Sequence, residues 1–168
     1  TLGLAAASGA RAAPGYYVVG VYDEQGVAAA ELRYWTVHRP GAPATLWPEL
    51  GLSYGVNSRW TTALLASWIG TQASATQLSS LNWTNDVLLT QGERPFDLAV
   101  HSALERVYGY DAGWALEAGP ALQTDLGRTR LNANLVFERV FGDDAGATQL
   151  KYQWQLLQRA TAGFGLGV

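Results

Sequence analysis

Residues 148–156 read Thr-Gln-Leu-Lys-Tyr-Gln-Trp-Gln-Leu, and the character of their side chains alternates without interruption. Leu150, Tyr152 and Trp154 belong to one parity, whereas Lys151 and Gln153 belong to the other. Successive side chains of a β-strand point to opposite faces of the sheet. The segment therefore predicts a strand with one aliphatic and aromatic face and one face of amides and an ammonium group.

The same alternation recurs along the chain, which predicts an all-β protein. Segments of about ten residues with alternating hydrophobicity, separated by turn residues, are typical of transmembrane β-barrels. We predict an antiparallel up-and-down transmembrane β-barrel with about nine strands in this chain. The predicted strands are residues 27–37, 45–56, 60–69, 77–90, 96–107, 112–123, 130–141, 148–156 and a last strand from Thr161. Pro120 lies inside the sixth segment and predicts a bulge or a break there, because proline cannot donate to the ladder.

The predicted links also alternate in length, since the first, third, fifth and seventh are slightly longer than the others. Periplasmic turns of outer-membrane barrels are short and their outer loops are longer. We therefore expect the longer set to lie outside the cell, at residues 39–44, 71–76, 108–111 and 142–146.

Composition narrows the class of protein. Charged residues make up 15% and aromatic residues 11% of the 168 residues, whereas soluble domains carry roughly 25% charged residues. The net charge of −3 argues against a nucleic-acid partner. The absence of cysteine excludes disulfides and thiolate metal sites, and the only histidines are His38 and His101. We expect neither a metal nor a cofactor.

The beginning of the chain predicts export. No apolar run approaches the roughly 18 residues of a transmembrane helix. Residues 2–7 resemble the end of a signal-peptide apolar region, and Ala10-Arg11-Ala12 matches an A-x-A cleavage site. We expect residues 1–12 to be a signal-peptide remnant and residues 13–168 an incomplete outer-membrane β-barrel domain. The alternative is an Ala- and Gly-rich leader.

If the apolar parity faces lipid, the other parity lines the lumen. The lumen then carries seven carboxylates, and Arg33 and Lys151 can neutralise only part of their charge. Such an acidic lumen attracts cations if the barrel conducts. The alternative is a structural polar network that fills a closed barrel. The predicted lumen-lining residues are Glu31, Arg33, Glu49, Asp86, Asp97, His101, Glu105, Glu117, Asn132, Asn134, Glu138, Lys151 and Gln153.

Outward residues predict contacts with the membrane interface. Trp60 and Trp68 bracket the third segment at a spacing close to the roughly 25 Å apolar band between aromatic girdles. The alternative is a pair of core tryptophans in a soluble sandwich. Arg106 and Arg139 have outward parity, where they either meet lipopolysaccharide phosphates or are solvated. The predicted girdle comprises Trp60, Trp68, Trp83, Trp114 and Trp154.

The sequence offers no catalytic constellation. A serine nucleophile and a histidine base on one strand need i, i+2 spacing to share a face. His101 and Ser102 are adjacent, so they point to opposite faces. His38 and Asp111 lie near strand ends but form no cluster with other acidic residues. We expect no enzymatic activity.

Five further stretches are informative together: Tyr16-Tyr17-Val18, residues 52–56, residues 119–127, residues 131–135 and residues 150–155. They resemble a family of uncharacterised proteobacterial outer-membrane β-barrel proteins, described as exported proteins. The resemblance implies a fold and a compartment, the bacterial outer membrane, but no reaction. Members of that family continue with further strands, and bacterial single-chain barrels have even strand numbers, so we expect truncation from ten or twelve strands.

The favoured function is porin-like passage or handling of a small, unspecified solute. Its expected partners are outer-membrane lipid, lipopolysaccharide and, during biogenesis, the barrel-assembly machinery. One alternative is a structural or adhesive barrel with a plugged lumen. Another is a soluble periplasmic lipocalin-like binding barrel, which inverts the faces. The membrane barrel alone predicts that the large apolar side chains are exposed, at Leu150, Tyr152 and Trp154. It also predicts that Gln153 and Glu117 face inward.

Overall fold

The computed structural model describes residue 21 and residues 24–109, 112–141, 147–161 and 164–167, with side chains described as far as residue 161. The predicted signal-peptide remnant lies outside these residues. The described residues form nine strands and no helix. The strands are β1 (Ala28–Val37), β2 (Thr45–Asn57), β3 (Trp60–Thr71), β4 (Ser74–Leu88), β5 (Asp97–Val107), β6 (Gly113–Leu126), β7 (Thr129–Phe141), β8 (Gln149–Thr161) and β9 (Phe164–Gly167).

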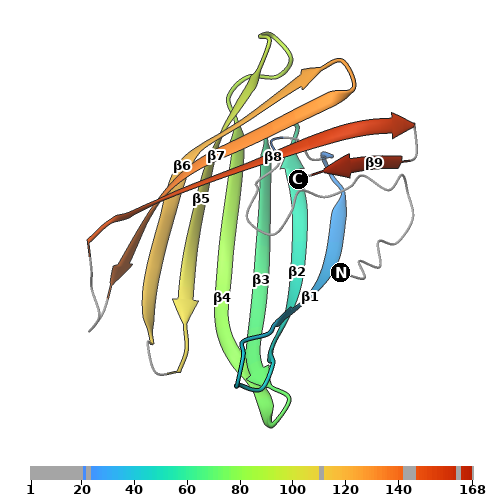
Figure 1. The fold of residues 1–168 in the computed structure, drawn as a ribbon. Coiled ribbons are helices and arrows are strands. Elements are labelled where there is room, and N and C mark those ends of the chain that lie inside the picture. Colours follow the sequence, from blue (N-terminus) through green and yellow to red (C-terminus); the bar gives the residue numbers. More distant parts are fainter. Residues whose placement is uncertain (1–20, 22–23, 110–111, 142–146, 162–163, 168) are drawn as a thin grey trace.

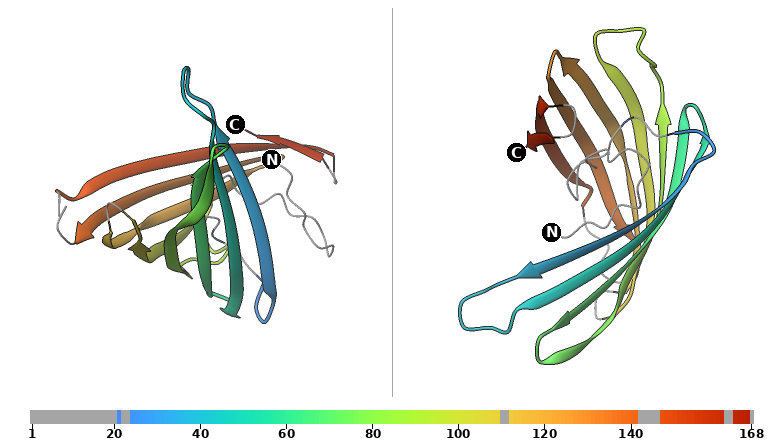
Figure 2. Two further views of the ribbon diagram at one scale, coloured as in Figure 1. Left: turned by 90° about the horizontal axis from the view of Figure 1, so that it is seen from below. Right: turned by 90° about the vertical axis from the view of Figure 1, so that its right-hand side faces the viewer.

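Each strand pairs antiparallel with its neighbours in sequence, in the order β1 to β9 (Figure 1). The all-β, up-and-down antiparallel prediction is therefore confirmed. The sheet is one layer that curls into half a barrel, and Figure 2 shows its curvature from two further directions. Strand direction changes progressively from β2 to β8, as the right-handed twist of strands requires (Figure 1).

The strand β6 continues through Pro120, so the predicted break is wrong, but Gly119 and Pro120 have no partners in the pairing of β6 with β7. Its pairing with β5 runs in one register from Asp97↔Gln123 to Val107↔Gly113. The pairs with β7 have the same register before and after Gly119 and Pro120. An ideal Cβ on Gly119 would lie 1.8 Å from the carbonyl oxygen of Leu135, so the two backbones approach closely there. The adjoining Gly119 and Pro120 are thus accommodated by a close approach of β7.

The predicted alternation of link lengths is wrong at both ends of β4. The β3–β4 link is only Gln72-Ala73, although the prediction placed it in the longer set. The β4–β5 link spans residues 89–96, although it belongs to the predicted shorter set. Asp97 stabilises this longer link. Its Oδ1 accepts hydrogen bonds from the Gly92 amide at 2.7 Å and from the Thr90 hydroxyl at 3.4 Å. Link length therefore does not identify the external end of the sheet.

The two faces of the sheet differ in chemistry in the predicted sense. Tyr152, Trp154 and Leu150 on β8 are 79%, 58% and 57% exposed, which confirms their predicted exposure. Gln153 and Lys151 between them are half-buried. The buried apolar residues of the described chain are mostly alanines, whereas the large aliphatic and aromatic side chains cover the outward, convex face. A soluble barrel has the opposite arrangement, so this pattern argues against the lipocalin-like alternative.

None of the described residues belongs to a helix long and apolar enough to cross a bilayer.

Candidate functional site

The concave face of the sheet carries every residue that was predicted to line a lumen. Cross-strand partners share a face, and the pairs Asp86↔His101 and Glu117↔Glu138 join neighbouring strands on this one. All of these residues are buried or half-buried. The sequence therefore predicted which side chains gather here. That this face encloses a lumen stays a prediction, because the described sheet is an open half-barrel.

Glu49 is the most enclosed carboxylate of this face, with 2% of its surface exposed. Ser67 on β3 donates a hydrogen bond to it at 2.9 Å, and the Trp35 indole of β1 donates another at 3.4 Å. Arg33 lies directly across from Glu49 in the register, yet its guanidinium binds Glu31 through two hydrogen bonds of 2.6 and 2.5 Å. This end of the concave face is therefore a packed polar cluster.

Lys151 on β8 connects two acidic residues of different strands. Its ammonium group lies 2.8 Å from Glu117 on β6 and also forms an ion pair with Glu138 on β7. Glu117 and Glu138 are direct cross-strand neighbours, so their like charges would repel each other without this cation. Because Lys151 reaches across β7 to β6, the side chains of this face converge. That convergence identifies it as the inner side of the curl.

His101 on β5 forms a pair with Asp86 that the sequence reading did not anticipate. The imidazole Nδ1 lies 2.6 Å from an Asp86 carboxylate oxygen, and His101 is 7% exposed. Ser102 lies on the other face, where its hydroxyl donates to the Asn85 carbonyl at 3.4 Å. His101 and Ser102 thus face apart, as the sequence predicted. The position opposite His101 on β6 is Gly119, which places no functional group there.

Amide side chains form a second polar region toward the β6–β7 hairpin. Asn132 and Asn134 are 2% and 4% exposed, and Gln123 lies directly across from Asn132 at 4%. The Asn132 amide donates to Gln155 on β8 at 3.3 Å. Buried amides of this kind usually have partners, but the Asn132 Oδ1 atom is buried and has no hydrogen-bond partner among the described residues. The neutral region borders the acidic one on the same concave face.

Sequence reasoning missed residues whose role depends on strand length or register. Asp125 extends the concave face because β6 ends at Leu126, three residues beyond the predicted strand. Its carboxylate accepts two hydrogen bonds from Arg130 at 2.8 and 3.0 Å. Ser67 was missed because residues 60–69 are apolar on both parities, so no alternation singled it out.

The chain before β1 also contacts the concave face. Val21 is 6% exposed and packs in a cluster with Leu88, Ala99 and Ala121, which lie on β4, β5 and β6. An ideal Cβ on Gly55 would lie 2.1 Å from the carbonyl oxygen of Glu24, so only glycine fits beneath that carbonyl. Both observations place described residues of the N-terminal side against the inside of the sheet. The side chains of Ala99 and Ala121 are small, which leaves room for Val21 to pack against the sheet.

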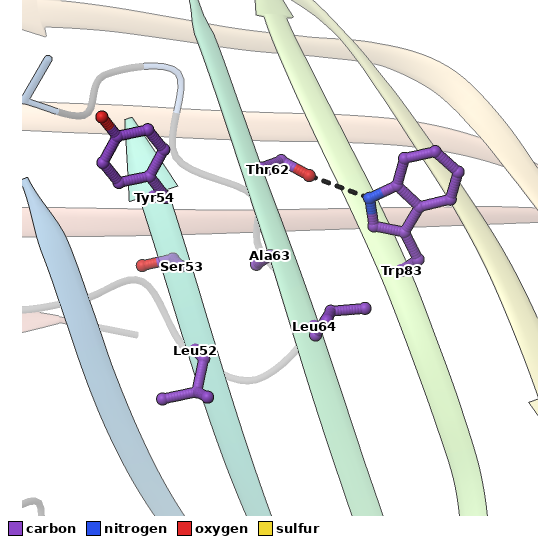
Figure 3. A pocket seen from close by; sticks show the side chains of 7 residues that line it. All are labelled: Leu52, Ser53, Tyr54, Thr62, Ala63, Leu64 and Trp83. Atoms are coloured by element: carbon purple, nitrogen blue, oxygen red, sulfur yellow. Dashed lines mark hydrogen bonds between the residues drawn. The ribbon is translucent and has the colours of Figure 1, made fainter. Parts of the chain in front are cut away.

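The convex face has a shallow apolar hollow across β2, β3 and β4 (Figure 3). Tyr54 and Trp83 stand on either side of Thr62, whose hydroxyl accepts a hydrogen bond from the Trp83 indole at 2.9 Å. Leu52 and Leu64 complete its apolar rim, and its volume is about 530 Å³. The hollow contains no charged residue, and its polar groups are those of Ser53, Tyr54 and the hydrogen-bonded pair of Thr62 and Trp83.

The predicted girdle residues occupy different positions on the convex face. Trp60, Trp83, Trp114 and Trp154 are 37%, 50%, 46% and 58% exposed, while Trp68 is half-buried. Trp83 lies opposite Leu64 near the middle of β3. A girdle residue is expected near the edge of the apolar band, so the girdle assignment stays a prediction.

No group of three or more acidic, histidine or cysteine side chains suited to a metal ion occurs in the described part of the chain. The expected absence of a cofactor stays a prediction. No protein-family model, curated protein or solved structure matches this chain.

Proposed function

We propose that this chain is an outer-membrane β-barrel protein whose concave face passes or handles small solutes, with a preference for cations, and that it has no catalytic role. The observation that carries the proposal is the separation of the two faces. Large apolar side chains are exposed on the convex face, as Leu64 at 61% and Tyr152 at 79% illustrate. Exposed apolar surface of this extent favours contact with a hydrocarbon phase.

The charge distribution supports the preference for cations. Every aspartate and glutamate in the described strands has concave parity, including the buried Glu49. Lys151 is shared between Glu117 and Glu138, and Arg33 is held by Glu31. These cations neutralise only part of the carboxylates, so the face keeps a negative potential. Rings of carboxylates select cations in aqueous pores.

Planar-bilayer conductance of the purified full-length protein tests the proposal. We expect discrete single-channel steps and, in a salt gradient, a reversal potential of the sign that cation permeation gives. An absence of steps from protein that has inserted into the bilayer would remove the pore function. A reversal potential of the opposite sign would contradict the role of the acidic face.

Removing the shared ammonium group sharpens this test. Lys151→Gln leaves Glu117 and Glu138 without their cation, so we expect the cation-over-anion permeability ratio to rise about fivefold, equivalent to ~1 kcal/mol for one unit charge at about 4 Å in water. Arg59→Gln is the matched control, because Arg59 pairs with Glu93 at the rim. An equal change in both variants would show that net charge, rather than the concave face, sets the ratio.

A plugged barrel is the second candidate, and the position of Val21 favours it. The contact of Val21 with Leu88, Ala99 and Ala121 places part of the chain inside the curl. A barrel closed by that segment would span the membrane without conducting. The conductance experiment separates the two candidates, provided that insertion into the bilayer is measured independently.

A further inference from the structure

Two cations interrupt an otherwise uncharged surface. Arg106 on β5 and Arg139 on β7 have convex parity, whereas the other charged residues of the described strands have concave parity. Arg139 is exposed and Arg106 half-buried. Neither forms an ion pair with a described carboxylate, since those of the strands point to the opposite face. A cation on an apolar face without an anion is unfavourable unless something else supplies the anion.

The two guanidinium groups stand at the same end of the sheet, and each lies over an aromatic ring. The Arg106 guanidinium carbon lies 5.2 Å from the centroid of the Trp114 ring and 5.8 Å from that of Tyr108. Arg139 lies 5.8 Å from the centroid of Phe141. Trp114 is the direct cross-strand partner of both Arg106 and Phe141. The aromatic rings thus separate the cations and hold them along the surface.

Aromatic rings beside arginines occur where an apolar surface meets polar headgroups. Tryptophan and tyrosine prefer this interface, and the planar guanidinium fork matches the oxygens of a phosphate. Arg106 also donates to the Gly113 carbonyl at 3.2 Å, which fixes one side of its fork and leaves the other available. A headgroup phosphate at this position would place an anion beside these cations.

We propose that Arg106, Arg139 and Trp114 form a binding site for the phosphate of an anionic lipid headgroup. The inference rests on the proposed membrane location. Because this end of the convex face carries two positive charges, we expect it to favour a phosphomonoester, whose charge approaches −2, over a phosphodiester of single charge. A phosphorylated glycolipid such as lipopolysaccharide has the chemistry that this site requires.

The test uses full-length protein in phosphatidylcholine nanodiscs that contain a small fraction of phosphatidic acid, which is a lipid phosphomonoester. Native mass spectrometry measures how much of each lipid the released protein retains. We expect preferential retention of phosphatidic acid over phosphatidylcholine and over phosphatidylglycerol. In Arg106→Gln/Arg139→Gln, retention should fall about tenfold, because two charge-assisted contacts are lost. Inorganic phosphate in solution should not compete, since it lacks the acyl chains.

Matched variants separate the site from general charge effects. Arg59→Gln/Arg128→Gln removes two cations from the hairpin turns at the other end of the sheet and should retain phosphatidic acid like the parent protein. Arg106→Lys/Arg139→Lys keeps the charge and should retain more than the glutamine pair. Equal retention in the parent and the glutamine pair, with both inserted in the nanodisc, would overturn this site alone. Failure of the parent protein to insert would overturn the proposed function as well.

Discussion

Gly119 illustrates how one residue on the concave face is constrained by the neighbouring backbone. The carbonyl oxygen of Leu135 occupies the position next to an ideal Cβ, at 1.8 Å, so any side chain would force β6 and β7 apart. Gly51 lies on the same face, but an added Cβ there would meet Leu65 and Glu31 at 3.7 and 3.8 Å, which are ordinary contact distances. A methyl side chain is therefore tolerated at Gly51 but not at Gly119.

We expect Gly119→Ala to lower the free energy of unfolding by about 1–3 kcal/mol, because inserting a methyl group into a closed space forces a backbone shift. Gly51→Ala serves as the control and should leave stability nearly unchanged. Urea unfolding of the folded protein, followed by tryptophan fluorescence, measures both. Equal stabilities of the two variants would show that the β6–β7 approach is looser than described.

At the scale of elements, the contact between Val21 and the sheet can be tested by cross-linking. The chain contains no cysteine, so engineered pairs give no background. Under oxidation we expect a disulfide in Val21→Cys/Ala99→Cys or Val21→Cys/Ala121→Cys, detected by its mobility on a non-reducing gel. Val21→Cys/Ala118→Cys is the control, because Ala118 is exposed on the convex face. No cross-link in either concave pair would contradict the contact.

Strand positions could be predicted from alternation, whereas contacts between strands could not. The alternation around Trp154 and Leu135 located β8 and β7 and assigned their faces, because burial on one side of a sheet imposes a period of two. The pair His101–Asp86 depends on the register of β4 with β5, which the length of the intervening link sets. Lys151 bridging to Glu117 depends on the curvature of the sheet, and no local pattern records curvature.

The described strands form a half-barrel with a polar concave face and an apolar convex face, and its edge strands β1 and β9 are not paired with each other in the described part of the chain. Within a bilayer, unpaired backbone groups are costly, so these edges need a partner strand there. The proposed membrane location therefore requires that the convex face meets hydrocarbon.

Single spin labels along β8 test that claim most directly, because the parent chain has no cysteine to remove. Cysteines replace Leu150, Lys151, Tyr152, Gln153 and Trp154 one at a time in the bilayer-reconstituted protein. Paramagnetic resonance then measures collision with oxygen, which concentrates in lipid, and with a water-soluble nickel complex. If the convex face meets hydrocarbon, labels at 150, 152 and 154 will collide mainly with oxygen, while those at 151 and 153 will not. High accessibility to the nickel complex at 150, 152 and 154 would contradict it.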